Sequence, residues 1–236
     1  MGKSLESVTS SLAALSDRYR MITHNLANSS THAFKRRVGT FAQVMDAQSK
    51  PRAEVIDSSE IDFSQGGMER TGRPLDLALD GEGFFTLETP DGPLYTRSGA
   101  FTVNQMGQLV DSAGRMVAGE SGPITIPANV PQEHVQVSAQ GEVFAAGAAL
   151  GRLKIVTFAQ AESLKQVGQG LYEAPPAARQ DSFTGRVQQG SRELSNVSVV
   201  QELVDLITVS RLYEANFKAI GQHDERLKQV LGVAMA

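Results

Sequence analysis

Both ends of this chain carry apolar residues that recur with alternating spacings of three and four. At the N-terminus the repeat consists of Leu5, Val8, Leu12, Leu15, Tyr19, Ile22 and Leu26. At the C-terminus it consists of Val199, Leu203, Leu206, Tyr213, Phe217, Ile220, Leu227 and Leu231, with the polar Ser210 and Asp224 in the same register. An α-helix places such residues on one stripe, which another helix must cover. We therefore predict two terminal coiled-coil helices whose stripes form an oligomer interface, so the pattern favours assembly over chemistry.

Local signals place the ends of the two helices. Ser4 can cap the first helix, which we expect to end near Ala27 because a polar run, 28–31, follows it. The last helix is expected to open at Ser198, with Gln201 as its capping-box partner, and to reach Leu231. Its first half is apolar beyond the stripe, at Val200, Val204, Ile207 and Val209. Since one partner helix cannot cover so wide a face, further copies of the chain are predicted to cover it.

Between the helices the apolar period changes to two. Leu75, Leu77 and Leu79 alternate with polar or small residues, as in a half-buried strand. Pro90-Asp91-Gly92 predicts a turn between strands at 84–88 and 94–97. Further short strands are predicted at 101–103, 108–110, 115–117, 123–127, 135–138, 142–145 and 153–158. No long helical period interrupts them, so we expect a compact antiparallel β domain, either a closed barrel or an open sandwich.

The predicted fold class is therefore α+β, with discontinuous terminal helices and a central antiparallel all-β domain. We predict a terminal helical coiled-coil domain made of residues 1–33 and 196–236. Residues 34–74 and 175–195 are predicted to be extended connectors, the first with a short helix near 41–47. The β domain is predicted to span 75–174.

Composition excludes several classes of function. The chain of 236 residues has no cysteine, which excludes disulfides and thiolate metal sites. Its net charge of −4 gives no general attraction to nucleic acid, and we interpret the basic run Lys35-Arg36-Arg37 as a solvated loop. No apolar run approaches the ~18 residues that span a bilayer, and the heptad-spaced N-terminus does not resemble a cleaved secretory signal.

Residues that could carry chemistry are scattered. None of His24, His32, His134 and His223 has metal-ligand spacing to another histidine or to a carboxylate pair. Asp76, Asp80 and Glu82 cluster but lack the closing acid of a calcium loop, so we interpret them as strand and turn residues. No phosphate-binding glycine loop or nucleophile elbow is present. We predict no catalytic residue, no metal, no cofactor and no small-molecule substrate.

Three collinear parts of the chain resemble the bacterial flagellar rod and hook family of axial proteins. They comprise Asn25–Arg36, then Thr71–Phe85 with Tyr95–Phe101, and finally Ser195–Leu203 with Arg211–Ile220. The positions that match the family's motifs are Asn25, Leu26, Ala27, Asn28, Phe34, Lys35, Asp80, Gly81, Gly83, Phe84, Phe85, Tyr213, Glu214, Ala215 and Asn216. The family usually has glycine at the position of Ala33.

The resemblance implies a structural subunit of the flagellar basal-body rod. Its terminal helices would pair around a channel, its β domain would face outward, and the helical polymer would transmit torque across the periplasm. The implied partners are copies of itself, other flagellar rod proteins and the flagellar type III export apparatus, which needs no cleaved signal. Only 33 positions separate Phe34 from Gly67 (67 − 34), which favours a proximal rod protein of the FlgF type over a distal one of the FlgG type or a hook protein.

Two other classes of function remain as alternatives. A coiled-coil-stalked adhesin or phage fibre would form a closed oligomer with a fixed number of subunits, whereas a rod subunit forms an open helical array. A cell-wall hydrolase would need acid, base or metal residues that converge in a cleft. Electron microscopy of purified assemblies would separate these classes.

Overall fold

The computed structural model describes the backbone of residues 2–39, 59–168 and 170–234, and side chains from residue 11 to residue 221 within these ranges except at 59 and 219. The chain divides into two compact units. Unit 1 comprises Met1–Ser29, Arg37–Ile61 and Val197–Ala236, and unit 2 comprises Ser30–Arg36 and Asp62–Asn196. Helices dominate unit 1 and antiparallel strands dominate unit 2, so the predicted α+β class is confirmed.

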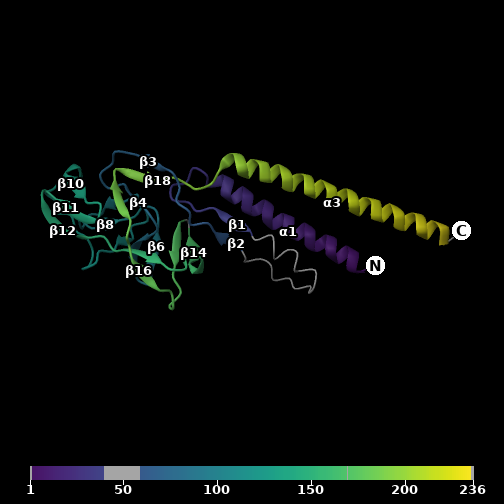
Figure 1. Ribbon diagram of the computed structural model, residues 1–236, viewed down its shortest axis with the longest axis horizontal. Coiled ribbons are helices and arrows are strands. Elements are labelled where there is room, and N and C mark those ends of the chain that lie inside the picture. Colours follow the sequence, from purple (N-terminus) through teal and green to yellow (C-terminus); the bar gives the residue numbers. More distant parts are fainter. Residues whose placement is uncertain (1, 40–58, 169, 235–236) are drawn as a thin grey trace. The chain divides into compact units, whose positions relative to one another are not determined.

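Unit 1 contains the two long helices, α1 (Gly2–Ala27) and α3 (Val199–Ala234). They lie side by side and run in opposite directions, so the two chain termini lie at the same end of the pair (Figure 1). A two-stranded sheet of β1 (Arg37–Gly39) and β2 (Ser59–Ile61) completes the unit. The predicted helix at 41–47 lies outside the described residues.

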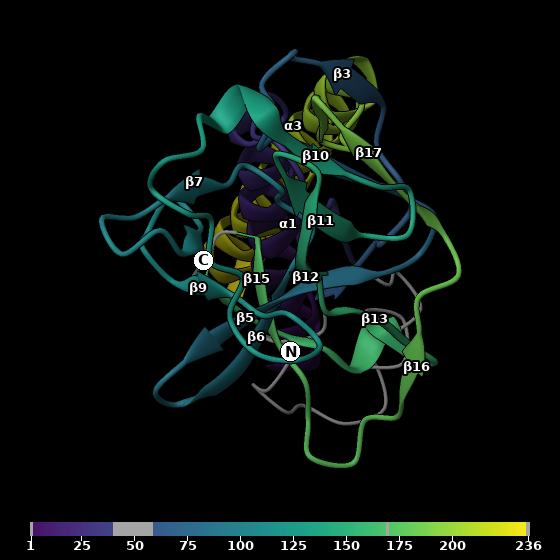
Figure 2. The same ribbon diagram turned by 90° about the vertical axis from the view of Figure 1, so that its left-hand side faces the viewer.

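Unit 2 is built around a large antiparallel sheet in the order β14-β15-β6-β5-β9-β8-β7, with β13 and β16 attached through β5. The bounds along the main path are β14 (Lys165–Gly168), β15 (Leu171–Glu173), β6 (Gly92–Thr96), β5 (Phe84–Thr89), β9 (Met116–Val117), β8 (Leu109–Val110) and β7 (Thr102–Val103). Figure 2 shows β13 (Ile155–Phe158) beside β16 (Gln180–Ser182), as their pairing requires. The β5–β6 hairpin turns at 90–91, which confirms the prediction from the Pro-Asp-Gly sequence.

Unit 2 also contains three smaller antiparallel sheets. A three-stranded sheet comprises β10 (Val135–Val137), β11 (Glu142–Ala145) and β12 (Ala148–Arg152). Two-stranded sheets pair β4 (Leu77–Asp80) with β17 (Arg186–Gln189), and β3 (Met68–Arg70) with β18 (Ser191–Glu193). Short 3-10 helices lie at Gln132–His134 and Ala161–Ser163.

Both stretches predicted to be extended connectors contain paired strands. β1, β2 and β3 fall within 34–74, and β16, β17 and β18 fall within 175–195. Each of these strands has only three or four residues and no clear apolar alternation, so the sequence carries little local signal for it. Their pairing is long-range instead, as in the register that places Val187 opposite Leu79.

The core of unit 2 lies between its sheets. Leu79, Phe85 and Leu87 are fully buried there, and the rings of Phe85 and Phe101 meet edge to face. The buried cluster comprises Leu75, Leu77, Leu79, Phe85, Leu87, Phe101, Leu109, Val117, Ile124, Ile126, Val135, Val143, Leu153 and Val187. All but Val187 come from the range predicted as the β domain.

Candidate functional site

The contact between α1 and α3 is the first candidate site. Two hydrogen bonds join the helices: the Asn25 amide donates to the Glu202 carboxylate at 3.4 Å, and the Tyr213 hydroxyl donates to the Leu12 carbonyl at 3.4 Å. Ile22 and Val209 are fully buried in this unit. Helical packing in unit 1 therefore already covers part of the apolar stripes.

The predicted stripe residues differ in exposure. Half-buried positions are Leu12, Leu15, Leu26, Leu206, Tyr213 and Ile220. Exposed positions are Tyr19, Val199, Leu203 and Phe217. The side chains of Leu5, Val8, Leu227 and Leu231 lie outside the described residues. The role of all these residues as an oligomer interface stays a prediction.

Within α3 the buried stripe is offset from the predicted one. Glu202 and Val209 are 0% exposed, and they replace Leu203 and Ser210 on the side that meets α1. Leu206 and Tyr213 belong to both stripes. The buried residue that faces α1 at this point is the polar Glu202. A pattern of apolar residues does not include a glutamate, so the predicted stripe runs through Leu203 instead.

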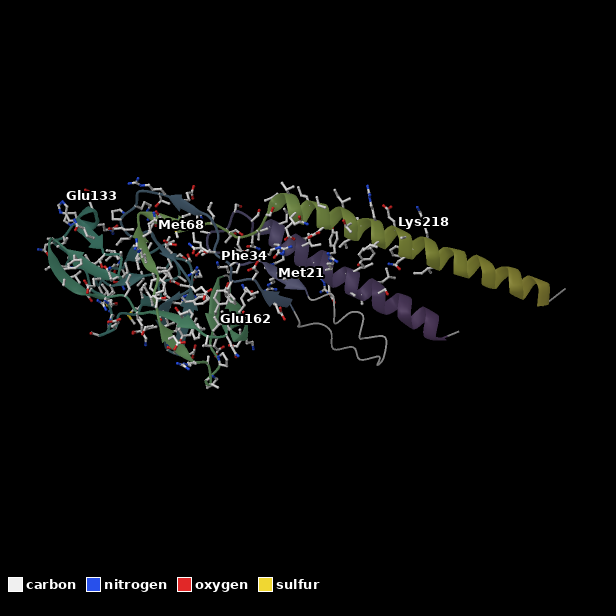
Figure 3. All side chains as sticks on the ribbon, in the orientation of Figure 1. Met21, Phe34, Met68, Glu133, Glu162 and Lys218 are labelled. Atoms are coloured by element: carbon white, nitrogen blue, oxygen red, sulfur yellow. The ribbon has the colours of Figure 1, made fainter. Side chains whose placement is uncertain are left out.

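The offset leaves one face of α3 apolar and exposed. Val200, Val204 and Ile207 are 73%, 50% and 54% exposed. In Figure 3, side chains stand along the edge of α3 that faces away from α1. We call this the outer face of α3, and its members are Val199, Val200, Leu203, Val204, Ile207 and Phe217. Several exposed apolar side chains on one helix face indicate a protein–protein contact.

A buried polar contact fastens the helices to β1. The Asn25 side chain, 1% exposed, accepts a hydrogen bond from the Arg37 backbone N–H and donates one to the Arg37 carbonyl, both at 2.9 Å. Its amide also donates to the Glu202 carboxylate at 3.4 Å. Asn25 thus holds the end of α1, the start of β1 and the first turn of α3 together. The family motif includes Asn25, and this geometry supplies a physical reason.

Asn25→Ala is expected to lower the free energy of unfolding of unit 1 by about 2–3 kcal/mol, because a buried side chain and its two hydrogen bonds to the part-buried Arg37 backbone are lost. Asn28→Ala is the matched control. The Asn28 amide donates to the His24 carbonyl at 2.8 Å from a half-buried position on the same helix, so a loss of about 0.5–1 kcal/mol is expected. Urea unfolding followed by helical circular dichroism measures both. Equal losses in the two variants would contradict the assignment.

The second candidate site is a buried ionic cluster in unit 2. The Glu193 carboxylate accepts from Lys35 Nζ at 2.7 Å and from the Gly66 backbone N–H at 3.0 Å. Its other oxygen lies 3.1 Å from Arg97 Nε. The Lys35 and Glu193 side chains are both 0% exposed, so the interpretation of Lys35 as part of a solvated loop is wrong. Its acidic partner lies 158 positions along the chain, beyond any local pattern.

Burial governs the electrostatics of this cluster. Desolvation lowers the pKa of Lys35 below its usual value, and the Glu193 carboxylate raises it part of the way back. Desolvation likewise lowers the pKa of Arg97, and Glu193 again opposes the shift. Two buried cations therefore depend on one buried carboxylate.

Backbone contacts surround the cluster. Lys35 Nζ also donates to the Ser64 carbonyl at 2.7 Å, and Arg97 donates to the carbonyls of Gly81 and Gly83 at 2.8 and 2.7 Å. We call Lys35, Ser64, Gly66, Arg97, Glu193 and Asn196 the junction cluster.

Asn196 links the same segments. Its side-chain oxygen accepts from the Arg36 backbone N–H at 2.7 Å, and its amide donates to the carbonyls of Asp62 and Ser64 at 2.8 and 3.1 Å. Sequence reasoning gave no role to Glu193 or Glu202. Arg97 and Asn196 stand in the stretches that resemble the family, which is the one signal that could have indicated them.

The remaining motif residues have mainly packing roles in unit 2. Phe34 is buried, and Ala33 before it adopts φ +57°, a left-handed conformation that explains why glycine is usual there. A Cβ on Gly83 would lie 2.6 Å from the Phe183 ring, so glycine permits that contact. The Phe84 ring meets Phe63, Phe158 and Tyr172 edge to face.

Other motif residues are exposed or half-buried. Ala27, Asp80, Glu214 and Ala215 lie at the surface, and the half-buried Asn216 donates to the Leu212 carbonyl. Among the side chains that the structure describes, which lie between residues 11 and 221, no three His, Asp or Glu gather as a metal site. In the part of the chain that the structure describes, no helix has the length and apolarity that a membrane span requires.

Comparisons with known proteins agree on one family. Residues 78–145 match the flagellar hook protein FlgE/F/G D1 domain, and residues 188–233 match the flagellar basal body rod FlgEFG protein C-terminal region. The chain is 32% identical to the flagellar basal-body rod protein FlgG of Buchnera aphidicola subsp. Schizaphis graminum, over 89% of this chain and 91% of the relative. It is 31% identical to Bacillus subtilis FlgG over 99% of both chains. It is also 31% identical to Escherichia coli FlgF, over 89% and 90%.

Proposed function

This chain belongs to the flagellar basal-body rod protein family, and on that premise we propose that it is a structural subunit of the rod that polymerises helically through its terminal helices. The observation that carries the proposal is the outer face of α3, where Val200, Val204 and Ile207 remain exposed in the single chain. Burying one such side chain contributes about 1.5–3 kcal/mol. The terminal helices then form coiled-coil contacts with neighbouring copies, and the β-rich unit 2 passes torque to them.

The wider setting follows from the same family. We place the protein in the periplasmic rod of the basal body, where its partners are copies of itself and other rod proteins, and we assign it no enzymatic activity. Delivery by the flagellar type III export apparatus, without a cleaved signal, belongs to the same proposal. We retain the predicted limits of the helical domain, 1–33 and 196–236, as the part that assembles.

The short first connector, in which 33 positions separate Phe34 from Gly67 (67 − 34), is the basis on which we propose a proximal position of the FlgF type. The distal, FlgG-type position is the alternative.

Ile207→Asp is expected to raise the concentration needed for polymerisation at least about a hundredfold, because each contact would lose an apolar group and bury a charge. Sedimentation and electron microscopy of the purified protein measure assembly, and circular dichroism checks that the subunit is folded. Thr208→Asp is the matched control, since Thr208 is exposed but lies a quarter-turn or more around α3. Normal assembly of Ile207→Asp, or equal loss in the control, would contradict the proposal.

A further inference from the structure

We propose that the junction cluster is a force-transmitting clamp, which fastens together within unit 2 the segments that lead to unit 1. The inference rests on the proposed function as a rod subunit and adds the residues through which each subunit carries mechanical load. The chain passes between the units at four peptide bonds, after Ser29, Arg36, Ile61 and Asn196. Force that travels along the chain must enter unit 2 at the residues that follow or precede these bonds.

The clamp joins the three segments of unit 2 that meet these bonds, which are 30–36, the segment that begins at Asp62 and the segment that ends at Asn196. We call these four peptide bonds the crossings. Glu193 lies three positions before Asn196 at the last crossing, and Lys35 lies one position before Arg36 at the second. Gly66 lies five positions after Ile61 at the third crossing. One carboxylate oxygen of Glu193 binds the other two, at 2.7 and 3.0 Å. The Glu193 carbonyl also accepts from the Ala33 N–H at 2.8 Å, so the segment that begins at Ser30 is held at two points.

A second layer of contacts lies closer to the crossings. Asn196 receives the Arg36 N–H and donates to the Asp62 carbonyl, and the Asp62 N–H donates to the Arg36 carbonyl at 2.9 Å. These three residues are the last or first of unit 2 at three different crossings. Each segment is therefore bonded directly to the other two at the boundary of the unit.

Arg97 connects the clamp to the large sheet. It follows β6 directly, pairs with the Glu193 carboxylate and donates to carbonyls on both sides of Glu82. Pulling on one segment must then break several buried charge-assisted hydrogen bonds together rather than one after another. Without the clamp, tension along α1 would reach residue 30 and peel the segment 30–36 away by itself.

Single-molecule pulling tests the clamp, and the absence of native cysteine allows handles at introduced cysteines. The clamp axis uses Ala13→Cys with Met106→Cys, so force enters unit 2 through Ser30. The reference axis uses Met106→Cys with Ala177→Cys, two exposed positions inside unit 2. Glu193→Gln is compared with Leu87→Ala, a core variant that weakens unit 2 without touching the clamp.

On the clamp axis, Glu193→Gln is expected to unfold unit 2 about a hundredfold faster than the parent at the same force, because breaking a buried ion pair is strongly destabilising. On the reference axis it should resemble Leu87→Ala. Asn196→Ala, which removes no buried charge, should reproduce the selective effect on the clamp axis if Glu193→Gln does not fold. Equal acceleration on both axes for Glu193→Gln, or for Asn196→Ala if Glu193→Gln does not fold, would overturn the proposal. Because single subunits are pulled, this result is independent of whether Ile207→Asp blocks polymerisation.

Discussion

Glu193→Gln is expected to lower the free energy of unfolding of unit 2 by about 3–5 kcal/mol, the usual cost of removing one member of a buried ion pair. The glutamine oxygen can still accept from Lys35 and Gly66, but the charge that balances Lys35 and Arg97 is lost. Denaturant unfolding followed by far-ultraviolet circular dichroism measures the loss.

The matched control for Glu193→Gln is Glu142→Gln. Glu142 pairs with Arg152 at 2.6 Å, but both side chains are 44% exposed. Surface pairs of this kind contribute about 0–1 kcal/mol, so the control should lose little stability. Adding Lys35→Met to Glu193→Gln should recover part of the deficit, because one of the two uncompensated cations is then removed. A loss in Glu193→Gln as small as in the control would mean that solvent reaches the cluster.

The pH dependence provides a second signature of the same cluster. The pKa of Lys35 is lowered by burial, so in the alkaline range below 10.5 the unfolded chain binds more protons than the folded chain. The free energy of unfolding contributed by this group therefore rises as the pH rises toward 10.5. Without the Glu193 carboxylate the pKa of Lys35 should fall further. The stability deficit of Glu193→Gln is thus expected to shrink between neutral and alkaline pH, and a constant deficit would contradict this.

Gly66→Ala is expected to lower the free energy of unfolding of unit 2 by about 1–3 kcal/mol or more. The added Cβ would overpack a site whose neighbouring backbone cannot easily move away. That atom would lie 2.1 Å from the Leu194 backbone oxygen. The segments cannot separate freely, because the Leu194 N–H donates to the Gly67 carbonyl at 2.7 Å and the Gly66 N–H donates to Glu193. Circular dichroism during urea unfolding gives the loss.

Gly67→Ala is the matched control one residue further along. A Cβ there would meet only the Leu194 side chain, at an ordinary contact distance of 3.6 Å. The expected change in the free energy of unfolding is within about 0.5 kcal/mol, as for most substitutions that create no clash. If Gly66→Ala were as stable as Gly67→Ala, the close approach of the two segments would be wrong.

The elements with strong local patterns were predicted well. The two long helices follow from the 3-4 apolar spacing, and the β5–β6 hairpin follows from the Pro-Asp-Gly turn. The β17 and β18 strands were missed, because strands this short are stabilised by pairing with strands far along the chain. Their partners lie 106 to 125 positions away, as in the pairing of Glu193 with Met68. Periodicity reports which face of an element is buried but not which distant segment covers it.

By itself, the amino-acid sequence determined the α+β class, the two amphipathic ends and the family resemblance, because helical and strand periods are local properties of the chain. Only the tertiary structure decided which stripe of α3 meets α1 and which stays exposed, since Glu202 and Asn25 form their contact across 177 positions. It likewise placed Lys35, which the sequence predicts to be a surface charge, in a buried ion pair with Glu193. Such polar contacts depend on long-range geometry, and a buried charge becomes tolerable only where folding delivers its partner.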